Sequence, residues 1–192
     1  ALTLPPEYAG QSASVVAIAP DPQTQNRLLA GVCVGWEYGP GLIYASINGG
    51  ITWTQQTTPT DIKCISRLVF DPQDPNVVYA GSSGSGLLRS TNRGVTWTFL
   101  ANQPTTSRFM SVEIDPDDSN SIYLCTFDRN NAGDGGIFST HDGGDTWAKM
   151  TGAGGPIWAL KFVKVGANYW LYAATMNNLR YLRTIPDDPT TE

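Results

Sequence analysis

Two stretches of the sequence combine aromatic rings with charged and amide side chains, a mixture that can bind a sugar. They are VCVGWEYGPG at 32–41 and TFDRNNAGDGG at 126–136. Aromatic rings stack on the C–H faces of sugars, while carboxylates and amides form hydrogen bonds with the hydroxyl groups. The candidate ligand-binding residues are Trp36, Glu37, Tyr38, Phe127, Asp128, Arg129 and Asp134. Solvated loops with one aromatic ring packed back onto the core have the same composition, so both interpretations stay open.

Cleavage of a glycosidic bond requires two carboxylates that face each other across the bond, roughly 5–10 Å apart. The acidic residues available in the expected loops are Glu37, Asp61, Asp128 and Asp134, and none lies in a motif that identifies a catalytic residue. We therefore assign no catalytic residue and lean towards a protein without enzymatic activity.

We expect no cofactor and no metal. The segment DRNNAGDGG offers oxygen donors from Asp128, Asn130 and Asp134, but without the regular spacing of a calcium-binding loop. His141 is the only histidine in the sequence and has no cysteine pair nearby, which argues against a zinc site.

An eight-residue motif, which we call the box, occurs three times and indicates the scaffold that positions these loops. Its copies are SINGGITW at 46–53, STNRGVTW at 90–97 and THDGGDTW at 140–147. The repeated residues are Ser46, Asn48, Gly50, Thr52, Trp53, Ser90, Asn92, Gly94, Thr96, Trp97, Thr140, Asp142, Gly144, Thr146 and Trp147. Two copies carry Asn where the third carries Asp, which a turn tolerates and a catalytic carboxylate does not. The box is therefore architectural: its Asn or Asp accepts backbone N–H groups within a hairpin, and its Trp fills the wedge between neighbouring sheets.

The boxes belong to longer units with a period of roughly 44–50 residues. Each unit contains an apolar strand that ends at a turn such as FDPQDPN, a second strand such as VVYAG, a third strand such as GLLRS, and a fourth that starts at the Thr-Trp pair. Four short strands per unit at this period predict an all-β fold, a β-propeller of about four blades. The predicted units are 14–57, 64–101, 108–151 and 156–184, with 185–192 as a tail.

The number of blades leaves three arrangements open: a small four-bladed ring, a segment of a larger propeller, or a half-ring that closes by association. The fourth unit has no box, and ALTLP at the start of the chain precedes the first full unit. Residues 1–13 are therefore expected to supply a closing strand for another blade. The expected partners are a second copy of the chain or the remainder of a larger propeller.

The box resembles the Asp-box, or BNR, repeat, and the whole unit resembles blades of Asp-box β-propellers. Members of that family include sortilin-type domains, xyloglucan-degrading glycoside hydrolases, bacterial sialidases and photosystem II assembly factors. The resemblance covers roughly residues 14–184 and implies a propeller whose boxes lie at the blade periphery. It does not single out one function, because the family includes hydrolases, receptors and assembly factors.

Charge and cysteine content limit the classes of binding partner and the cellular compartments that we expect for this protein. The net charge of −5 and the absence of a basic run argue against nucleic acid, and no apolar stretch is long enough for a membrane span. Cys33 and Cys64 are expected on the same face of adjacent blades, so a disulfide between them is plausible and would indicate an oxidising compartment. Cys125 lies at a position that requires a small residue and is expected to be a buried thiol.

These observations favour a secreted, extracellular, cell-surface or periplasmic module that binds or assembles without enzymatic activity. Two alternatives remain: a propeller that binds or cleaves a polysaccharide, and an assembly factor for a membrane complex.

Overall fold

The computed structural model describes residues 2–35, 39–104, 109–127, 135–150, 157–175 and 179–182. They form four antiparallel sheets in chain order, which we number blades 1 to 4. Blade 1 contains β1 (Ala13–Pro20), β2 (Leu28–Val34), β3 (Gly41–Ser46) and β4 (Thr54–Gln55). Blade 2 contains β5 (Ile65–Phe70), β6 (Val78–Ser82), β7 (Gly86–Ser90) and β8 (Thr98–Phe99). Blade 3 contains β9 (Phe109–Asp115), β10 (Asp118–Thr126), β11 (Gly136–Thr140) and β12 (Ala148–Lys149), and blade 4 contains β13 (Ile157–Val165), β14 (Asn168–Thr175) and β15 (Leu179–Leu182).

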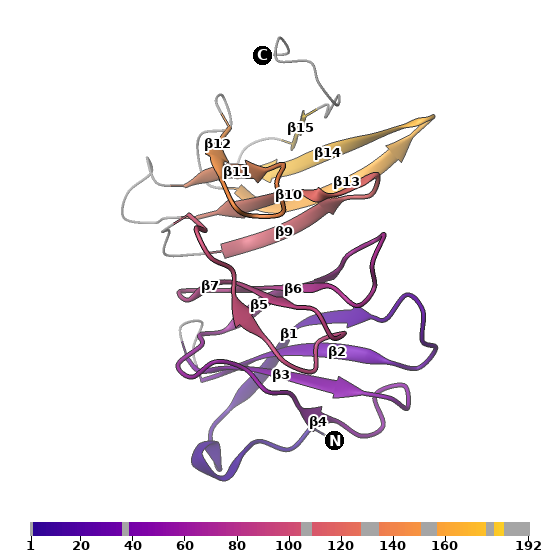
Figure 1. The fold of residues 1–192 in the computed structure, drawn as a ribbon. Helices are drawn as coiled ribbons and strands as arrows, with labels where there is room; N and C mark the ends of the chain where they lie inside the picture. Colours follow the sequence, from indigo (N-terminus) through magenta and orange to yellow (C-terminus); the bar gives the residue numbers. More distant parts are fainter. Residues whose placement is uncertain are drawn as a thin grey trace.

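The blades follow one another in an open stack, with blade 1 at one end and blade 4 at the other (Figure 1). Their first strands are the inner strands, and these make contacts from β1 to β5, from β5 to β9 and from β9 to β13. No comparable contact joins β1 to β13 among the described residues. The all-β propeller fold predicted from the sequence is confirmed, but the blades do not close into a four-bladed ring.

Each neighbouring pair of blades shares one apolar core. Leu29 and Ile43 of blade 1 pack with Leu68 and Leu88 of blade 2, and all four side chains are buried. Equivalent clusters join blade 2 to blade 3 and blade 3 to blade 4. Because strands alternate their side chains between two faces, one face of each blade contacts the preceding blade and the other contacts the next. We call these the proximal and distal faces.

The boxes form the hairpins at the outer edge of blades 1 to 3, as the sequence predicts. In blade 2, Asn92 Oδ1 accepts the Thr96 N–H at 2.9 Å, and the Trp97 indole N–H donates to the Gly94 carbonyl at 3.0 Å. The same two bonds occur in the other boxes, from Thr52 to Asn48, from Trp53 to Gly50, from Thr146 to Asp142 and from Trp147 to Gly144. The hairpin therefore fixes the tryptophan ring that packs between blades.

Residues 2–12 contain no strand in this structure, and the closing role expected for residues 1–13 stays a prediction. The segment instead forms a short 3₁₀ turn, η1 (Pro6–Tyr8), next to two prolines that cannot donate to a strand ladder. Leu2, Leu4 and Tyr8 pack on the proximal face of blade 1, and the Tyr44 hydroxyl donates to the Thr3 carbonyl at 2.9 Å. The segment thus covers part of the face that a preceding blade would cover, and we call it the N-terminal cap.

An ion pair links the first turn of blade 1 to the box of blade 2. Asp21 is fully buried and accepts hydrogen bonds from Arg93 at 2.7 Å and from Arg27 at 3.0 Å. Arg93 has a φ of 63°, in the left-handed region where the other boxes carry Gly49 and Gly143. A non-glycine residue there costs about 1–2 kcal/mol, and the ion pair with Asp21 offsets that cost.

The same carboxylate makes folding sensitive to acid. Burial acts to raise the pKa of Asp21, but hydrogen bonds from Arg93 and from the Gln23 and Thr24 N–H groups outweigh it, so the pKa lies below the ordinary 3.8. A lowered folded-state pKa contributes stability above pH 3.8, and this stability is lost as the pH falls through the folded-state pKa.

We predict that Asp21→Asn lowers the free energy of unfolding at pH 7 and that the difference from the wild type shrinks below pH 3.8. Urea unfolding at pH 7, 5, 4 and 3 measures both quantities. Asp145→Asn, which removes an exposed box carboxylate, is the control and should change stability little at any pH. A pH-independent loss in Asp21→Asn would show that the charge is not the cause.

A second prediction concerns the box tryptophans. Trp97 is 4% exposed between blades 1 and 2, so Trp97→Ala should cost about 3–5 kcal/mol of unfolding free energy. Trp53 is half-buried against the N-terminal cap, so Trp53→Ala should cost less. Urea unfolding of the two variants compares them directly, and equal losses would contradict a wedge role for Trp97.

Within the described part of the chain, no helix has the length and apolar character needed to span a bilayer.

Candidate functional site

The two loops singled out from the sequence fall largely outside the described residues. This applies to Trp36, Glu37, Tyr38, Asp128, Arg129 and Asp134. Phe127 is described, and it is buried at 6% exposure directly after β10. Asp61, another acidic candidate, is exposed in the connection between blades 1 and 2 and is not among the residues that line the cleft described below.

Phe127 supports a second aromatic ring. The Phe127 and Trp158 rings are stacked, with centroids 4.9 Å apart and planes 27° apart, and Trp158 is 40% exposed. The exposed face available to a ligand is therefore that of Trp158, while Phe127 holds it in place.

Trp158 is exposed because of a bulge that recurs in every inner strand. The register of the first and second strands shifts between Val15 and Ala17, between Ile65 and Arg67, and between Ile157 and Ala159. In blade 3 the shift leaves out Met110. A bulge re-aims the side chain of the extra residue. In blades 1, 2 and 4 the extra residues are Val16, Ser66 and Trp158.

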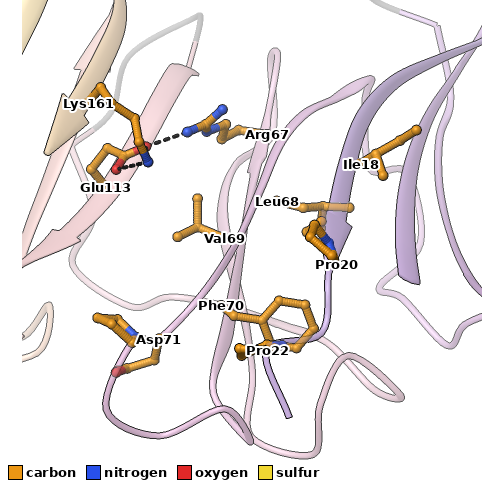
Figure 2. Close-up of a pocket in the computed structure, with 12 residues that line it drawn as sticks. Ile18, Pro20, Pro22, Arg67, Leu68, Val69, Phe70, Asp71, Glu113 and Lys161 are labelled. Atoms are coloured by element: carbon orange, nitrogen blue, oxygen red, sulfur yellow. Dashed lines mark hydrogen bonds and ion pairs between the residues drawn. The ribbon is translucent and has the colours of Figure 1, made fainter. Parts of the chain in front are cut away.

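Three charged residues meet on the inner strands of three successive blades. Glu113 on β9 lies between Arg67 on β5 and Lys161 on β13, and accepts hydrogen bonds from both (Figure 2). The Lys161 Nζ to Glu113 Oε2 distance is 3.1 Å. The Glu113 side chain is 5% exposed, whereas those of Arg67 and Lys161 are 35% and 66% exposed. The trio carries one net positive charge on a protein whose overall charge is −5.

The trio lines a cleft of about 270 Å³ along the inner strands. Its other walls are largely apolar, with Ile18, Pro20 and Pro22 from blade 1 and Val69 and Phe70 from blade 2 (Figure 2). Arg67 Nε is buried and has no hydrogen-bond partner. The cleft thus presents cations beside an apolar wall, which suits a ligand with carboxylate and apolar groups.

The two acidic side chains of the cleft already have structural partners. Glu113 binds the two cations, and Asp71 is buried and accepts hydrogen bonds from the Ser119 hydroxyl at 2.6 Å and the Gln73 N–H at 2.9 Å. Asp71 occupies the first turn of its blade, where Asp21 and Asp115 accept N–H groups in the same way. These aspartates stabilise the first turn of their blades.

The described residues contain no cluster of three or more His, Cys, Asp or Glu side chains that could hold a metal ion. His141 is exposed at the second position of the third box, where its Nδ1 lies 2.8 Å from the Ser121 hydroxyl.

A disulfide joins Cys33 to Cys64, the pair that the sequence places on adjacent blades. The chain on both sides of it is closely packed: a Cβ on Gly41 would overlap the Lys63 carbonyl, so only glycine fits there. Cys125 is a buried free thiol, and burial raises its pKa to about 12, which keeps it protonated and unreactive.

Comparison with known proteins identifies the family. The model of the Sortilin-Vps10 family (Sortilin, neurotensin receptor 3) matches residues 41–163. The chain belongs to this family. A search of curated protein sequences found no match to it.

Solved structures share the propeller fold with this Sortilin-Vps10 chain. An ancestral GH74 enzyme is 22% identical, with a TM-score of 0.73 over 88% of this chain and 25% of that one. The GH74 xyloglucanase from Xanthomonas campestris is 20% identical, with a TM-score of 0.63 over 92% and 32%. YCF48 bound to D1 peptide is 15% identical, with a TM-score of 0.62 over 95% and 54%. This chain therefore spans between a quarter and about half of the length of these structures, and at these identities the likeness shows the fold alone.

Sequence reasoning missed Trp158, Glu113 and Lys161 as site residues of this Sortilin-Vps10 chain. A signal was available, because Arg67, Glu113 and Lys161 are 46 and 48 residues apart, close to the repeat period. Residues one period apart on inner strands lie side by side, so an Arg–Glu–Lys series at that spacing predicts an ion-pair cluster.

We predict that Glu113→Gln lowers the free energy of unfolding by about 1–3 kcal/mol, because it leaves the two cations without their shared carboxylate. Lys161→Ala should cost within about 1 kcal/mol, since Lys161 is largely solvated. Urea unfolding at low and high salt measures both. Equal costs for the two variants would contradict a buried central carboxylate.

Proposed function

We propose that this chain is a binding module without enzymatic activity that takes up a polypeptide segment on the inner-strand face of its blades. The observation that carries the proposal is the cleft, where Arg67 and Lys161 flank a buried carboxylate beside an apolar wall. A peptide with acidic and apolar side chains complements both parts of that surface.

The carboxylates of the cleft support binding over glycoside cleavage. A hydrolase needs one carboxyl group to donate a proton and a second to act as nucleophile or base. Glu113 and Asp71 are instead engaged by Arg67, Lys161 and Ser119. Both carboxylates thus have structural partners, which supports binding over cleavage.

The names of related proteins agree with peptide recognition. The description of the matching family names a receptor, neurotensin receptor 3. One solved propeller of similar fold is a complex with a D1 peptide. These names describe those proteins, and for this chain they support the proposal.

We place the module in an oxidising compartment, secreted or at a cell surface. The support is the disulfide between Cys33 and Cys64, since such bonds persist mainly outside the reducing cytosol.

The proposal predicts that charge on the cleft controls binding. The probe is a pool of fluorescent nonapeptides that carry Glu beside Leu or Phe, with a matched pool in which Gln replaces Glu. The wild type should bind the acidic pool, and Arg67→Gln or Lys161→Gln should weaken binding by about tenfold through loss of a charge-assisted bond.

Lys149→Gln is the matched control, because it removes an exposed lysine from the outer strand β12. Fluorescence anisotropy measures the dissociation constants, and far-ultraviolet circular dichroism confirms folding of each variant. Equal binding of the acidic and neutral pools, or equal loss in Lys149→Gln, would overturn the proposal.

A second candidate, carbohydrate binding, is favoured by the exposed ring of Trp158 over Phe127 and by the fold shared with the GH74 enzymes. Trp158→Ala separates the two functions. Loss of retention on a xyloglucan affinity gel, with peptide binding intact, would support carbohydrate binding, whereas no retention of the wild type would exclude it for this ligand.

A further inference from the structure

The first box contains the only Asn-Gly pair of the sequence, Asn48 followed by Gly49. In such a pair the backbone nitrogen of the glycine can attack the asparagine Cγ, because glycine has no Cβ to hinder the approach. The new bond closes a succinimide ring and the bond from Cγ to Nδ2 breaks, so ammonia leaves with the proton of the attacking nitrogen. Water then opens the ring at one of its two carbonyl groups and leaves aspartate or isoaspartate.

Both reacting groups of this pair are held by hydrogen bonds in the folded box. The Gly49 N–H donates to the Asn26 carbonyl at 2.8 Å. Asn48 Oδ1 accepts the Thr52 N–H at 2.9 Å, and Asn48 Nδ2 donates to the Thr52 hydroxyl at 2.8 Å. The Ser46 hydroxyl donates to the same Oδ1 at 3.0 Å. The proton of the attacking nitrogen is therefore engaged, and the amide cannot turn towards that nitrogen without breaking these bonds.

The second and third boxes have the same protecting bond but no Asn-Gly pair. The N–H groups of Arg93 and Gly143 donate to the carbonyls of Asn76 and Asn120, at 2.8 Å and 3.0 Å. In the second box the residue after the asparagine is Arg93, whose side chain hinders the attack. The third box has an aspartate in place of the asparagine, so it has no ammonia to lose. The reactive pair is therefore confined to blade 1.

The third box shows that the fold accepts an aspartate at this position. Asp142 Oδ1 accepts the Thr146 N–H at 2.9 Å, and the Thr146 hydroxyl donates to Oδ2. Hydrogen bonds from the Thr140 and Thr146 hydroxyls lower the pKa of Asp142, so the box favours a charged carboxylate. For the first box to hold an aspartate in the same way, the Thr52 hydroxyl needs only to turn from acceptor to donor.

We propose that Asn48 is a site of spontaneous deamidation that the folded box protects and that reacts only when the box hairpin opens. Opening releases the Gly49 N–H from Asn26, so the rate in the folded protein is the rate of the unfolded segment multiplied by the open fraction. The aspartate product returns to the box and adds a negative charge to blade 1. Isoaspartate adds a carbon atom to the backbone, so the hairpin cannot restore the hydrogen bond from the Gly50 N–H to Ser46.

Peptide mapping by mass spectrometry tests this proposal on full-length proteins kept at pH 8 and 37 °C. The samples are the folded wild type, the wild type in guanidinium chloride, Ser46→Ala, and Ser90→Ala as the matched control in the second box. Asn48 should deamidate at least about tenfold faster in the unfolded wild type than in the folded one. Ser46→Ala removes hydrogen bonds that hold the box and should speed up the reaction by about tenfold. Ser90→Ala removes the same bonds but should not speed up deamidation of Asn92, because Arg93 follows it.

Circular dichroism checks that Ser46→Ala is folded. If it is not, Thr52→Val takes its place, because Thr52 is exposed and the change removes only the acceptor of Asn48 Nδ2. Asn48→Asp, which has the sequence of the aspartate product, should unfold at the same denaturant concentration as the wild type. The proposal is wrong if the folded and unfolded wild type deamidate at equal rates, or if the loosened first box reacts no faster than the wild type. It is also wrong if Ser90→Ala speeds up its own box equally, or if Asn48→Asp unfolds at a clearly lower denaturant concentration.

Discussion

Face-to-face packing of successive twisted sheets is the constraint on which the structure depends. Blades 2 and 3 have an apolar face on both sides, and each of these faces is buried against a neighbouring blade. The sheets touch along their inner strands and separate towards the periphery, where a boxed hairpin supplies a tryptophan to fill the wedge. Where a neighbour is absent, at the proximal face of blade 1, the N-terminal cap takes part of its place.

The same packing explains what the sequence could and could not predict. Hairpins, turns and the pairing of Cys33 with Cys64 depend on local chemistry or on adjacent repeats. The spacing of residues in the sequence is therefore enough to predict them. The packing of residues 2–12 depends on which apolar face lacks a neighbouring blade, here the proximal face of blade 1. No local sequence pattern predicts this. Trp158 was missed because its exposure results from a bulge and from support by Phe127, both set by packing between strands.

Function follows from the shared edge of the blades. The inner strands bring together side chains that are one repeat apart, so a small number of substitutions on this scaffold creates a charged or aromatic surface without a change of fold. In this chain the result is Glu113 held between Arg67 and Lys161, at the edge of an apolar cleft. The carboxylate holds the two cations at the edge of the cleft, and this arrangement is the basis of the proposed peptide binding.

Hydrogen–deuterium exchange of the wild-type protein, with and without the tightest-binding acidic nonapeptide, tests directly whether the inner-strand cleft is the binding site. We predict added protection in β5 and β9, the inner strands that carry Arg67 and Glu113, and no change in the three boxes. Protection confined to the boxes, or to the loops around 36–38 and 128–134, would contradict the inner-strand cleft as the binding site.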